Sequence, residues 1–272
     1  MTRITSASQA LDSDSSEGES SSSLEVLSPY FTGLVIDDLP LLLEASYRVR
    51  YQVYCNERGF LPAEDYPDQL ETDVFDAQSV HLGVVNTQGD LVATARLVQR
   101  GAAGLPMDSH CELFPDEPRL DNPDYSVVEI SRLAVSRRYN QRAGDGFYGL
   151  QGGRTSTIDG TGRVERRGGG EIVLTLFKAI YQESRRRGFT HWVSASERSL
   201  RRLVAKYGFM SRAIGPDCDY YGIVSPCVVD LRDLSAEIAS GEIPVLRKFL
   251  DGLEPEFWPA EAQVSPPCTS RR

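Results

Sequence analysis

A nearly unbroken apolar run of strand length, VVEISRLAV at residues 127–135, constrains the fold more than any other segment. Such a run predicts a central strand with both faces covered. The segment 171–188, EIVLTLFKAIYQESRRRG, has the pattern of a helix that stops at Gly188, and THWVSAS at 190–196 predicts the next strand. A strand, a crossover helix and a second strand indicate one parallel, right-handed unit.

The remaining apolar segments predict a larger sheet around this unit. They indicate a helix over 39–58, a β-hairpin over 79–86 and 91–99, a helix over 199–208, a strand over 219–231, and short helices over 231–239 and 243–251. Because a hairpin precedes the parallel unit, the sheet is expected to be mixed. The sequence therefore predicts an α/β fold with a mixed, mostly antiparallel sheet of about six strands, flanked by helices.

Composition divides the chain into three parts. Residues 1–28 are serine-rich and acidic and predict a disordered tail, 29–252 predict one folded domain, and 253–272, which contain four prolines, predict a flexible tail. The odd set of five cysteines with no CxxC pair argues against a disulfide framework or a structural zinc site. The acidic start is unlike a signal peptide and the apolar runs are too short to cross a bilayer, so a cytoplasmic protein without a transmembrane segment is expected.

Charge is distributed unevenly along the chain. The net charge is −10, yet residues 132–212 alone carry +11 and the remainder −21. This asymmetry predicts an anionic ligand or partner for the basic segment, the alternative being a solvated arginine-rich helix face. The acidic remainder would repel a long polyanion and no nucleic-acid-binding signature is present, so nucleic acid is not expected as a partner.

Charged residues also fall in or beside the predicted core elements. Glu129 and Arg132 interrupt the central strand, while the others are Arg50, Arg96, Asp73 and Asp76. Unrelated surface ion pairs are the commoner fate of charged side chains. That alternative accounts for the two loop aspartates, but it accounts poorly for a glutamate and an arginine within one buried strand.

Four motifs in fixed order resemble the acyl-homoserine-lactone autoinducer synthases. They are R-x-x-V-Y at 50–54, E-x-D-x-F-D at 71–76, A-R-L at 95–97 and E-I-S-R-L-A-V at 129–135. The complete sequence of residues 47–76 is even more similar to the PEP-CTERM/exosortase-associated acyltransferases. Both groups belong with the N-acyl amino acid synthases in the GNAT N-acyltransferase superfamily, and the resemblance covers roughly residues 45–210.

The resemblance implies a GNAT-like fold and an N-acyltransferase. The enzyme would move a fatty acyl group from an acyl carrier protein or CoA to a small amine, with an amino acid as the expected acceptor and no permanently bound cofactor. It also implies a connected charge network of Arg50, Asp73, Asp76, Arg96, Glu129 and Arg132, with Ser131 nearby.

Acyl transfer to an amine needs a proton acceptor and a group that stabilises the oxyanion. Glu129 is the candidate base, and backbone amides near Val135 are candidates to hold the thioester oxygen. Arg132 and Arg96 would orient an acceptor carboxylate or keep Glu129 ionised. Strand alternation separates Glu129 and Ser131 from Arg132, unless a β-bulge of the kind found in GNAT enzymes redirects the strand.

Two glycine-containing segments are candidates for the acyl-donor site. Gln141, Gly144 and Gly146 match the superfamily pattern Q/R-x-x-G-x-G/A, but 24 residues separate them from the helix at Glu171. The triple glycine that includes Gly169 and Gly170 directly precedes that helix and is the alternative anion nest.

One departure from the autoinducer synthases concerns the product. Those enzymes usually have Trp where this chain has Phe60, and the loop from Phe60 to Asp73 is longer here. Both features argue against a homoserine-lactone product, which stays as an alternative. An alternative of another class is a non-catalytic GNAT module that binds an acyl carrier protein or a ligand. His81 is expected to be a packing residue, and His110 and Cys111 to be structural.

Overall fold

A mixed β-sheet organises the computed structural model, which describes residues 30–115, 120, 122–136, 155–158, 164–167 and 169–263. Within these residues eight strands form the sheet in the order β1-β2-β3-β4-β7-β10-β8, with β9 paired to β10. The strands are β1 (Phe31–Val35), β2 (Ser79–Asn86), β3 (Leu91–Gln99), β4 (Val127–Val135), β7 (His191–Ser196), β8 (Arg212–Ala213), β9 (Cys218–Asp219) and β10 (Ile223–Asp230). Only the β4–β7 pairing among these strands is parallel.

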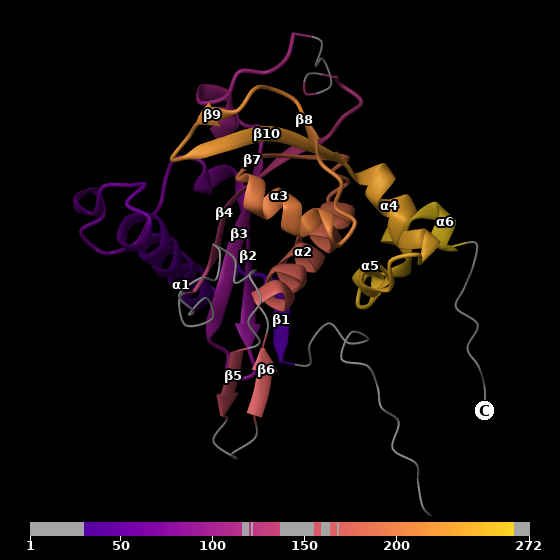
Figure 1. Ribbon diagram of the computed structural model, residues 1–272, viewed down its shortest axis with the longest axis horizontal. Helices are drawn as coiled ribbons and strands as arrows, with labels where there is room; N and C mark the ends of the chain where they lie inside the picture. The colour runs from indigo at the N-terminus through magenta and orange to yellow at the C-terminus, as the bar shows by residue number, and fades with distance from the viewer. Residues whose placement is uncertain are drawn as a thin grey trace, which may run out of the picture.

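Helices cover the sheet on both sides (Figure 1). Helix α1 (Pro40–Tyr51) contacts β2, β3 and β4, whereas α2 (Gly169–Arg186) contacts β1, β2 and β3. Strand β1 lies so close to α2 that a Cβ atom at Gly33 would come within 2.8 Å of the Thr175 carbonyl oxygen, which explains the glycine there. The main core, including Leu82, Ala95 and Ile180, fills the space between the sheet and α2.

Shorter helices complete the fold. They are η1 (Gln52–Glu57), a π-helix that continues α1, the 3₁₀ turns η2 (Ala63–Asp65), η3 (Asp76–Gln78) and η4 (Pro106–Ser109), and the helices α3 (Arg198–Ala205), α4 (Leu231–Ser240) and α5 (Pro244–Arg247). At the end of the described chain come the 3₁₀ turns η7 (Lys248–Leu250) and η8 (Pro255–Phe257) and the helix α6 (Ala260–Gln263). No helix within the described residues has the length and apolar character needed to span a membrane.

The predicted fold class is confirmed. Strand β4 has the predicted bounds, and it pairs in parallel with β7 after the α2 crossover. Strand β1 was not predicted from the sequence, nor was the hairpin of β5 (Thr155–Ile158) and β6 (Val164–Arg167). The segments of the hairpin, TSTI and VERR, carry no apolar run that stands out from their polar neighbours.

Residues 253–263 differ from the flexible tail expected from residue 253 onward. Up to Gln263 the backbone follows the body of the protein, with Leu253 and Ala262 buried in the main core. The Trp258 indole N–H donates to the Leu253 carbonyl oxygen at 2.9 Å, and Arg185 of α2 donates to the Phe257 carbonyl oxygen. The prolines therefore shape a packed turn around apolar anchors.

The sheet opens between its two central strands. Parallel pairing joins Val127, Val128 and Glu129 to β7, and it goes no further along β4. Beyond Glu129 the residues of β4 that still pair, Ile130, Ser131, Ala134 and Val135, pair with β3. The gap that follows lies at the centre of the molecule and contains the candidate site.

Candidate active site

A β-bulge on β4 positions the candidate catalytic residues. Ser131 pairs with Arg96 and Ala134 pairs with Thr94, so two residues of β4 lie opposite the single residue Ala95. Arg132, in the bulge, has a φ of +51°, a left-handed conformation that is rare for a non-glycine residue. The expected bulge is therefore present. It allows the side chains of Ser131 and Arg132 to reach one cluster despite strand alternation.

The charged residues beside the sheet form a connected ionic network. Its members come from α1, the loop before β2, β3 and β4, and are Arg50, Glu71, Asp73, Asp76, Arg96 and Arg132. Arg50 donates to Glu71 and, at 2.7 and 3.1 Å, to both oxygens of Asp76. Three arginines face three carboxylates, so the network is neutral when fully ionised. That balance is what permits it to be buried.

The other two arginines connect the network to β4. Arg96 donates to both oxygens of Asp73 at 2.6 and 2.7 Å, to Asp76 at 2.7 Å, and through Nε to the Ser131 hydroxyl at 3.0 Å. Arg132 donates to Glu71 and to Asp73, both at 3.1 Å. The network thus fixes the bulged part of β4 to the loop that carries Glu71 and Asp73.

His81 belongs to the network, which corrects its interpretation as a packing residue. Its two ring nitrogens lie 2.7 Å from Asp37 and 3.0 Å from Asp76. Burial disfavours the charged ring, but the two carboxylates outweigh that effect and raise the pKa of His81. Burial likewise opposes ionisation of Asp76, yet hydrogen bonds from His81 and Arg50 outweigh it and hold the pKa of Asp76 well below its usual range.

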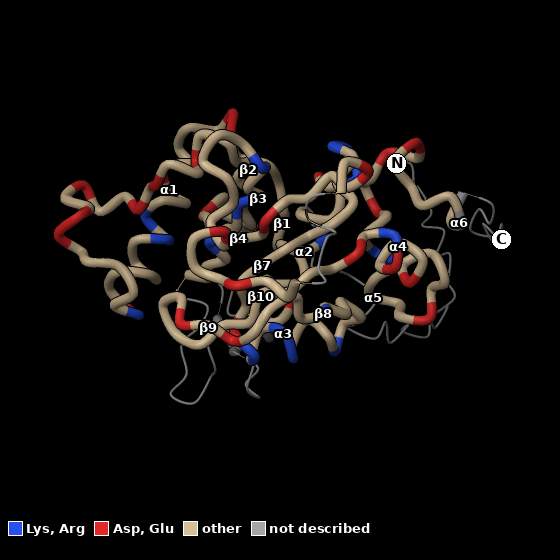
Figure 2. Tube along the Cα trace, turned by 90° about the horizontal axis from the view of Figure 1, so that it is seen from above, with Lys and Arg blue, Asp and Glu red and all other residues tan. Residues whose placement is uncertain are grey.

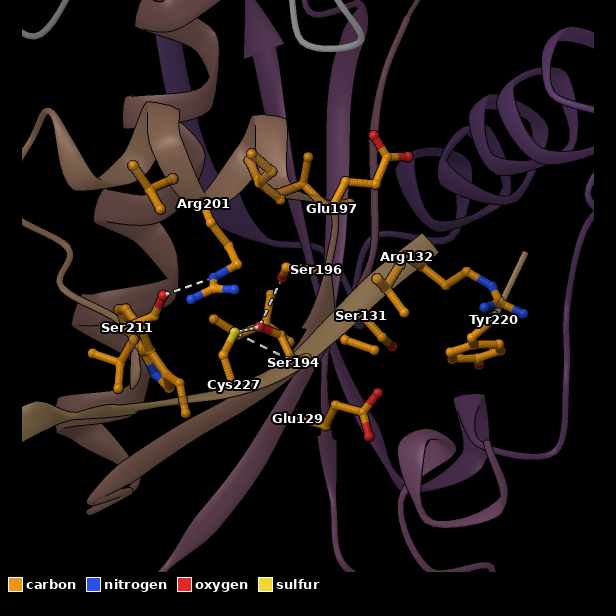
Figure 3. A pocket seen from close by; sticks show the side chains of 18 of the residues that line it. Glu129, Ser131, Arg132, Ser194, Ser196, Glu197, Arg201, Ser211, Tyr220 and Cys227 are labelled. Atoms are coloured by element: carbon orange, nitrogen blue, oxygen red, sulfur yellow. Dashed lines mark hydrogen bonds between the residues drawn. The ribbon is translucent and has the colours of Figure 1, made fainter. Parts of the chain in front are cut away.

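A cavity of about 150 Å³ occupies the gap between β4 and β7 (Figure 3). On one side β4 and the β9–β10 turn contribute polar side chains, which are Glu129, Ser131, Arg132 and Tyr220. The rest of the lining is mixed. It includes the apolar side chains of Phe177, Trp192, Leu200, Val204, Phe209 and Val229 and the polar side chains of Ser194, Ser196, Glu197, Arg201 and Ser211. A cavity lined by both apolar and polar side chains suits an amphipathic substrate, such as an acyl chain that ends in a reactive head group.

Glu129 lines the cavity and is 1% exposed. Its Oε2 accepts a hydrogen bond of 2.9 Å from the backbone N–H of Met107. Burial raises the pKa of Glu129 to about 8. This corrects the expectation that Arg96 and Arg132 keep Glu129 ionised. Both arginines are bonded to the carboxylates of the network, and their longer-range attraction is too weak to offset desolvation.

Three of the donor-site candidates, Val135, Gly169 and Gly170, do not line this cavity. Val135 pairs with Ala93 at the end of β4, and the role expected for the backbone amides near it stays a prediction. Gly169 and Gly170 form the first turn of α2 and do not line the cavity. Gln141, Gly144 and Gly146 lie outside the described residues.

Several residues of the site were not identified as site residues from the sequence. Glu71 is fully buried and bonds both Arg50 and Arg132, and its presence in the motif at 71–76 was the signal that could have selected it. Tyr54 on the π-helix η1 lines the cavity and donates to the Leu133 carbonyl oxygen at 3.0 Å. Tyr220 lies far along the sequence in a segment without a motif, so nothing in the sequence indicated it.

Part of the chain matches a known protein family. Residues 49–148 match the family model described as acetyltransferase (GNAT) domain. This segment includes α1 from Val49 onward, the loop of the ionic network, and strands β2 to β4. No curated protein sequence matches the chain.

Solved structures share the fold at low sequence identity. The CoA-dependent acyl-homoserine lactone synthase BjaI, solved with SAM and isopentyl-CoA, is 18% identical over 82% of this chain and 89% of its own, with a TM-score of 0.52. FeeM, an N-acyl amino acid synthase from uncultured soil microbes, is 15% identical over 77% of this chain and 95% of its own, with a TM-score of 0.50. TofI, in a ternary complex with an inhibitor and MTA, is 18% identical over 74% and 91%, with a TM-score of 0.50.

Proposed function

We propose that this acyltransferase with a GNAT domain moves a fatty acyl group from a carrier thioester to the amine of a small acceptor, most simply an amino acid. The amine nitrogen attacks the thioester carbonyl carbon, the C–N bond forms, and the C–S bond breaks to release the carrier thiol. The proton that the amine loses passes to Glu129, directly or through water. No covalent acyl-enzyme is required.

The observation that carries this proposal is the position of Glu129. Its side chain lines the same cavity as the apolar side chains of Phe177 and Phe209, so an acyl chain packed against those two rings could present its thioester to the Glu129 carboxyl group. Burial raises the pKa of Glu129 to about 8, which suits a group that must accept a proton near neutral pH. The same carboxylate on an exposed surface would be a weaker base.

Arg132 is the proposed contact for an acceptor carboxylate. It lines the cavity and also bonds Glu71 and Asp73, so its guanidinium is held in place before the acceptor arrives. Arg96 does not line the cavity and acts as a positioning residue, which holds Asp73 and Asp76 and orients Ser131. The similarity in fold to FeeM, an N-acyl amino acid synthase, supports an amino acid as the acceptor.

The test is identification of the product. Purified protein should be supplied with acyl carrier protein or CoA thioesters and with a panel of amino acids, and free thiol should be measured alongside product mass. We expect thiol release to depend on the amine and the product to be an N-acyl amino acid. Thiol release that is independent of any amine would contradict N-acyl transfer.

A homoserine-lactone product is the second candidate, because BjaI and TofI share the fold. The BjaI structure contains SAM and an acyl-CoA, so S-adenosylmethionine belongs in the acceptor panel. An acyl-homoserine lactone formed from it, with no product from amino acids, would establish the alternative. The Phe60 side chain lines the cavity where those synthases usually carry Trp, and this favours the amino acid.

The pH dependence of turnover tests the role of Glu129. A base must be deprotonated to act, and with a pKa of about 8 Glu129 is mostly protonated at neutral pH. We therefore expect kcat/KM to rise from pH 6.5 and to level off above about pH 8, since this parameter reports ionisations of the free enzyme and free substrate. A panel of amines with different pKa values separates the enzyme's ionisation from the acceptor's. A profile that follows only the pKa of the amine would contradict the assignment.

A basic stripe on α3 supports an acidic carrier protein as the acyl donor. Arg198, Arg202 and Lys206, the last at the C-cap of α3, recur at helical spacing and are exposed. Figure 2 shows basic residues along α3. Leu200 and Val204 of the same helix line the cavity. Carrier-dependent turnover is therefore expected to weaken as salt rises, because exposed charges are screened beyond about 8–10 Å at physiological ionic strength.

A triple alanine variant of the stripe makes this prediction specific. This variant combines Arg198→Ala, Arg202→Ala and Lys206→Ala. It should raise the KM for an acyl carrier protein and reduce the salt dependence of carrier-dependent turnover, with little effect on turnover of an acyl-CoA donor. Arg232→Ala, on α4, is the control with an exposed arginine away from the cavity. Salt-insensitive turnover with a clear preference for acyl-CoA would establish CoA as the donor.

A further inference from the structure

Two cysteines from distant parts of the sequence meet beside the cavity. The Sγ atoms of Cys111 and Cys218 lie 3.1 Å apart, although 107 residues separate them. Cys111 follows the 3₁₀ turn η4, and Cys218 begins β9. Both thiols are partly exposed. A disulfide needs a sulfur separation of about 2.05 Å, so an approach of about 1 Å would suffice.

The backbones around this pair already lie together. The Phe114 N–H donates to the Ile214 carbonyl oxygen at 2.8 Å. A Cβ atom at Gly215 would come within 2.0 Å of the Glu112 carbonyl oxygen, so only glycine permits this approach. The two segments are thus held side by side without the cysteines, and their sulfurs meet without strain being imposed on either segment.

Both segments carry residues of the active site. The Met107 N–H bonds Glu129, and Tyr220 lines the cavity two residues after Cys218. His110, adjacent to Cys111, stacks on Tyr220 with ring centroids 3.9 Å apart and planes 10° from parallel. The thiol pair and the ring stack therefore join the same two segments across one wall of the cavity, and in the reduced protein this wall is held by non-covalent contacts.

We propose that Cys111 and Cys218 are a redox-active dithiol whose oxidation to a disulfide locks this wall of the cavity. A peroxide is the oxidant. One thiol attacks the peroxide and its O–O bond breaks, which gives a sulfenic acid and an alcohol, or water when the oxidant is hydrogen peroxide. The second sulfur attacks the sulfenic sulfur, the S–S bond forms and water leaves. The two sulfurs together lose two electrons and two protons, and a thiol reductant reverses the change.

Two further observations fit this chemistry. Neither sulfur needs to be assigned as the first to react, because the 3.1 Å separation lets either thiol resolve a sulfenic acid formed on the other. Within the part of the chain that the structure describes, no group of three or more His, Cys, Asp or Glu side chains could hold a metal ion. The pair thus lacks the further ligands of a structural zinc site. Intracellular disulfides of this kind are usually transient and redox-sensing.

The effect on turnover rests on the proposed function. Tyr220 and Tyr221, in the turn between β9 and β10, both line the cavity, and Tyr221 is in a left-handed conformation with a φ of +57°. If this turn opens to admit the acceptor and release the product, a disulfide at its base slows that step. Turnover is then expected to fall severalfold on oxidation and to recover on reduction.

The experiment treats the reduced full-length protein with hydrogen peroxide. Non-reducing peptide mapping should recover the Cys111 peptide linked to the Cys218 peptide, and dithiothreitol should remove the link. A cross-link that closes a loop of this length should raise Tm by about 5–10 °C. The Cys218→Ser variant should lose both the link and the rise in Tm, whereas Cys55→Ala, which removes a buried thiol on η1, should retain both.

The outcomes are separable. Independent alkylation of both thiols after peroxide treatment, or a link from Cys111 to Cys227 instead, would overturn the dithiol. A Cys111–Cys218 link with turnover unchanged would overturn the lock on the cavity wall. Absence of acyl transfer in both the reduced and the oxidised protein, with the link still formed, would count against the proposed function and leave the dithiol standing.

Discussion

Glu129→Gln is expected to slow acyl transfer by about 10²–10⁴-fold, the usual contribution of a general acid–base group. Glutamine preserves the size of the side chain and can still accept the hydrogen bond from the Met107 N–H, but it cannot take a proton from the amine. The loss should therefore appear in kcat. Release of carrier thiol in the presence of an acceptor measures it, with the N-acyl product confirmed by mass.

Stability separates a chemical role for Glu129 from a structural one. Its folded-state pKa of about 8 lies above the ordinary value of 4.5, so the protonated side chain favours the folded state. That contribution is fully present below about pH 4.5 and is lost as pH rises toward 8. Glutamine never ionises, so the variant should melt at a higher temperature than the wild type at pH 8–9.

Glu183→Gln is the matched control, because Glu183 is a buried carboxylate on α2 that pairs with Arg187 outside the cavity. It should leave kcat close to that of the wild type. A folded Glu129→Gln protein with full activity would remove Glu129 from the mechanism. An inactive variant that is also unstable at pH 8–9 would indicate a structural role instead.

The sequence predicted the fold where long apolar runs mark the elements. Strand 127–135, the helix that follows it and the hairpin before it all stand out by periodicity, and together they imply the mixed sheet. Strand β1 has five residues and β8 and β9 have two each, too few for a pattern to emerge. These strands form because neighbouring strands offer them unpaired backbone groups. Such pairing depends on tertiary contacts, which the local sequence does not reveal.

The ionic network was predictable because its members interrupt apolar patterns. Arg50 on a helix stripe and Arg132 in a buried strand each require a partner, and the motif at 71–76 supplies the carboxylates. The residues that line the cavity were harder to predict from the sequence. Glu129 was grouped with the arginines by charge, yet the structure directs it toward Met107 and the cavity, since each arginine already has its carboxylates. Tyr220 reaches the cavity only through the β9–β10 turn.

Arg50→Met is expected to destabilise the protein by roughly 3–5 kcal/mol, the cost of removing one partner from a buried ion pair. Methionine keeps the length of the side chain but leaves Glu71 and Asp76 without the donor that offsets their charge. The Glu71 carboxylate would be destabilised most, because it is fully buried and, among the described contacts, would keep only the 3.1 Å bond from Arg132. Urea unfolding with the slope held common to both proteins measures the change.

The same helix supplies the control. Arg48 lies half a turn from Arg50 and pairs with Glu44, but its side chain is 56% exposed. Removing an exposed pair at this helical spacing costs about 0.3–0.5 kcal/mol, so Arg48→Met should fall near the wild type. Comparable losses for the two variants would mean that Arg50 contributes packing and helix propensity alone. A large loss confined to Arg50→Met, accompanied by reduced turnover in the fraction that remains folded, would show that the network positions the bulge of β4. Arg132 would then have to change its hydrogen bonds to accommodate the unpaired Glu71, and the acceptor carboxylate would lose its preorganised contact.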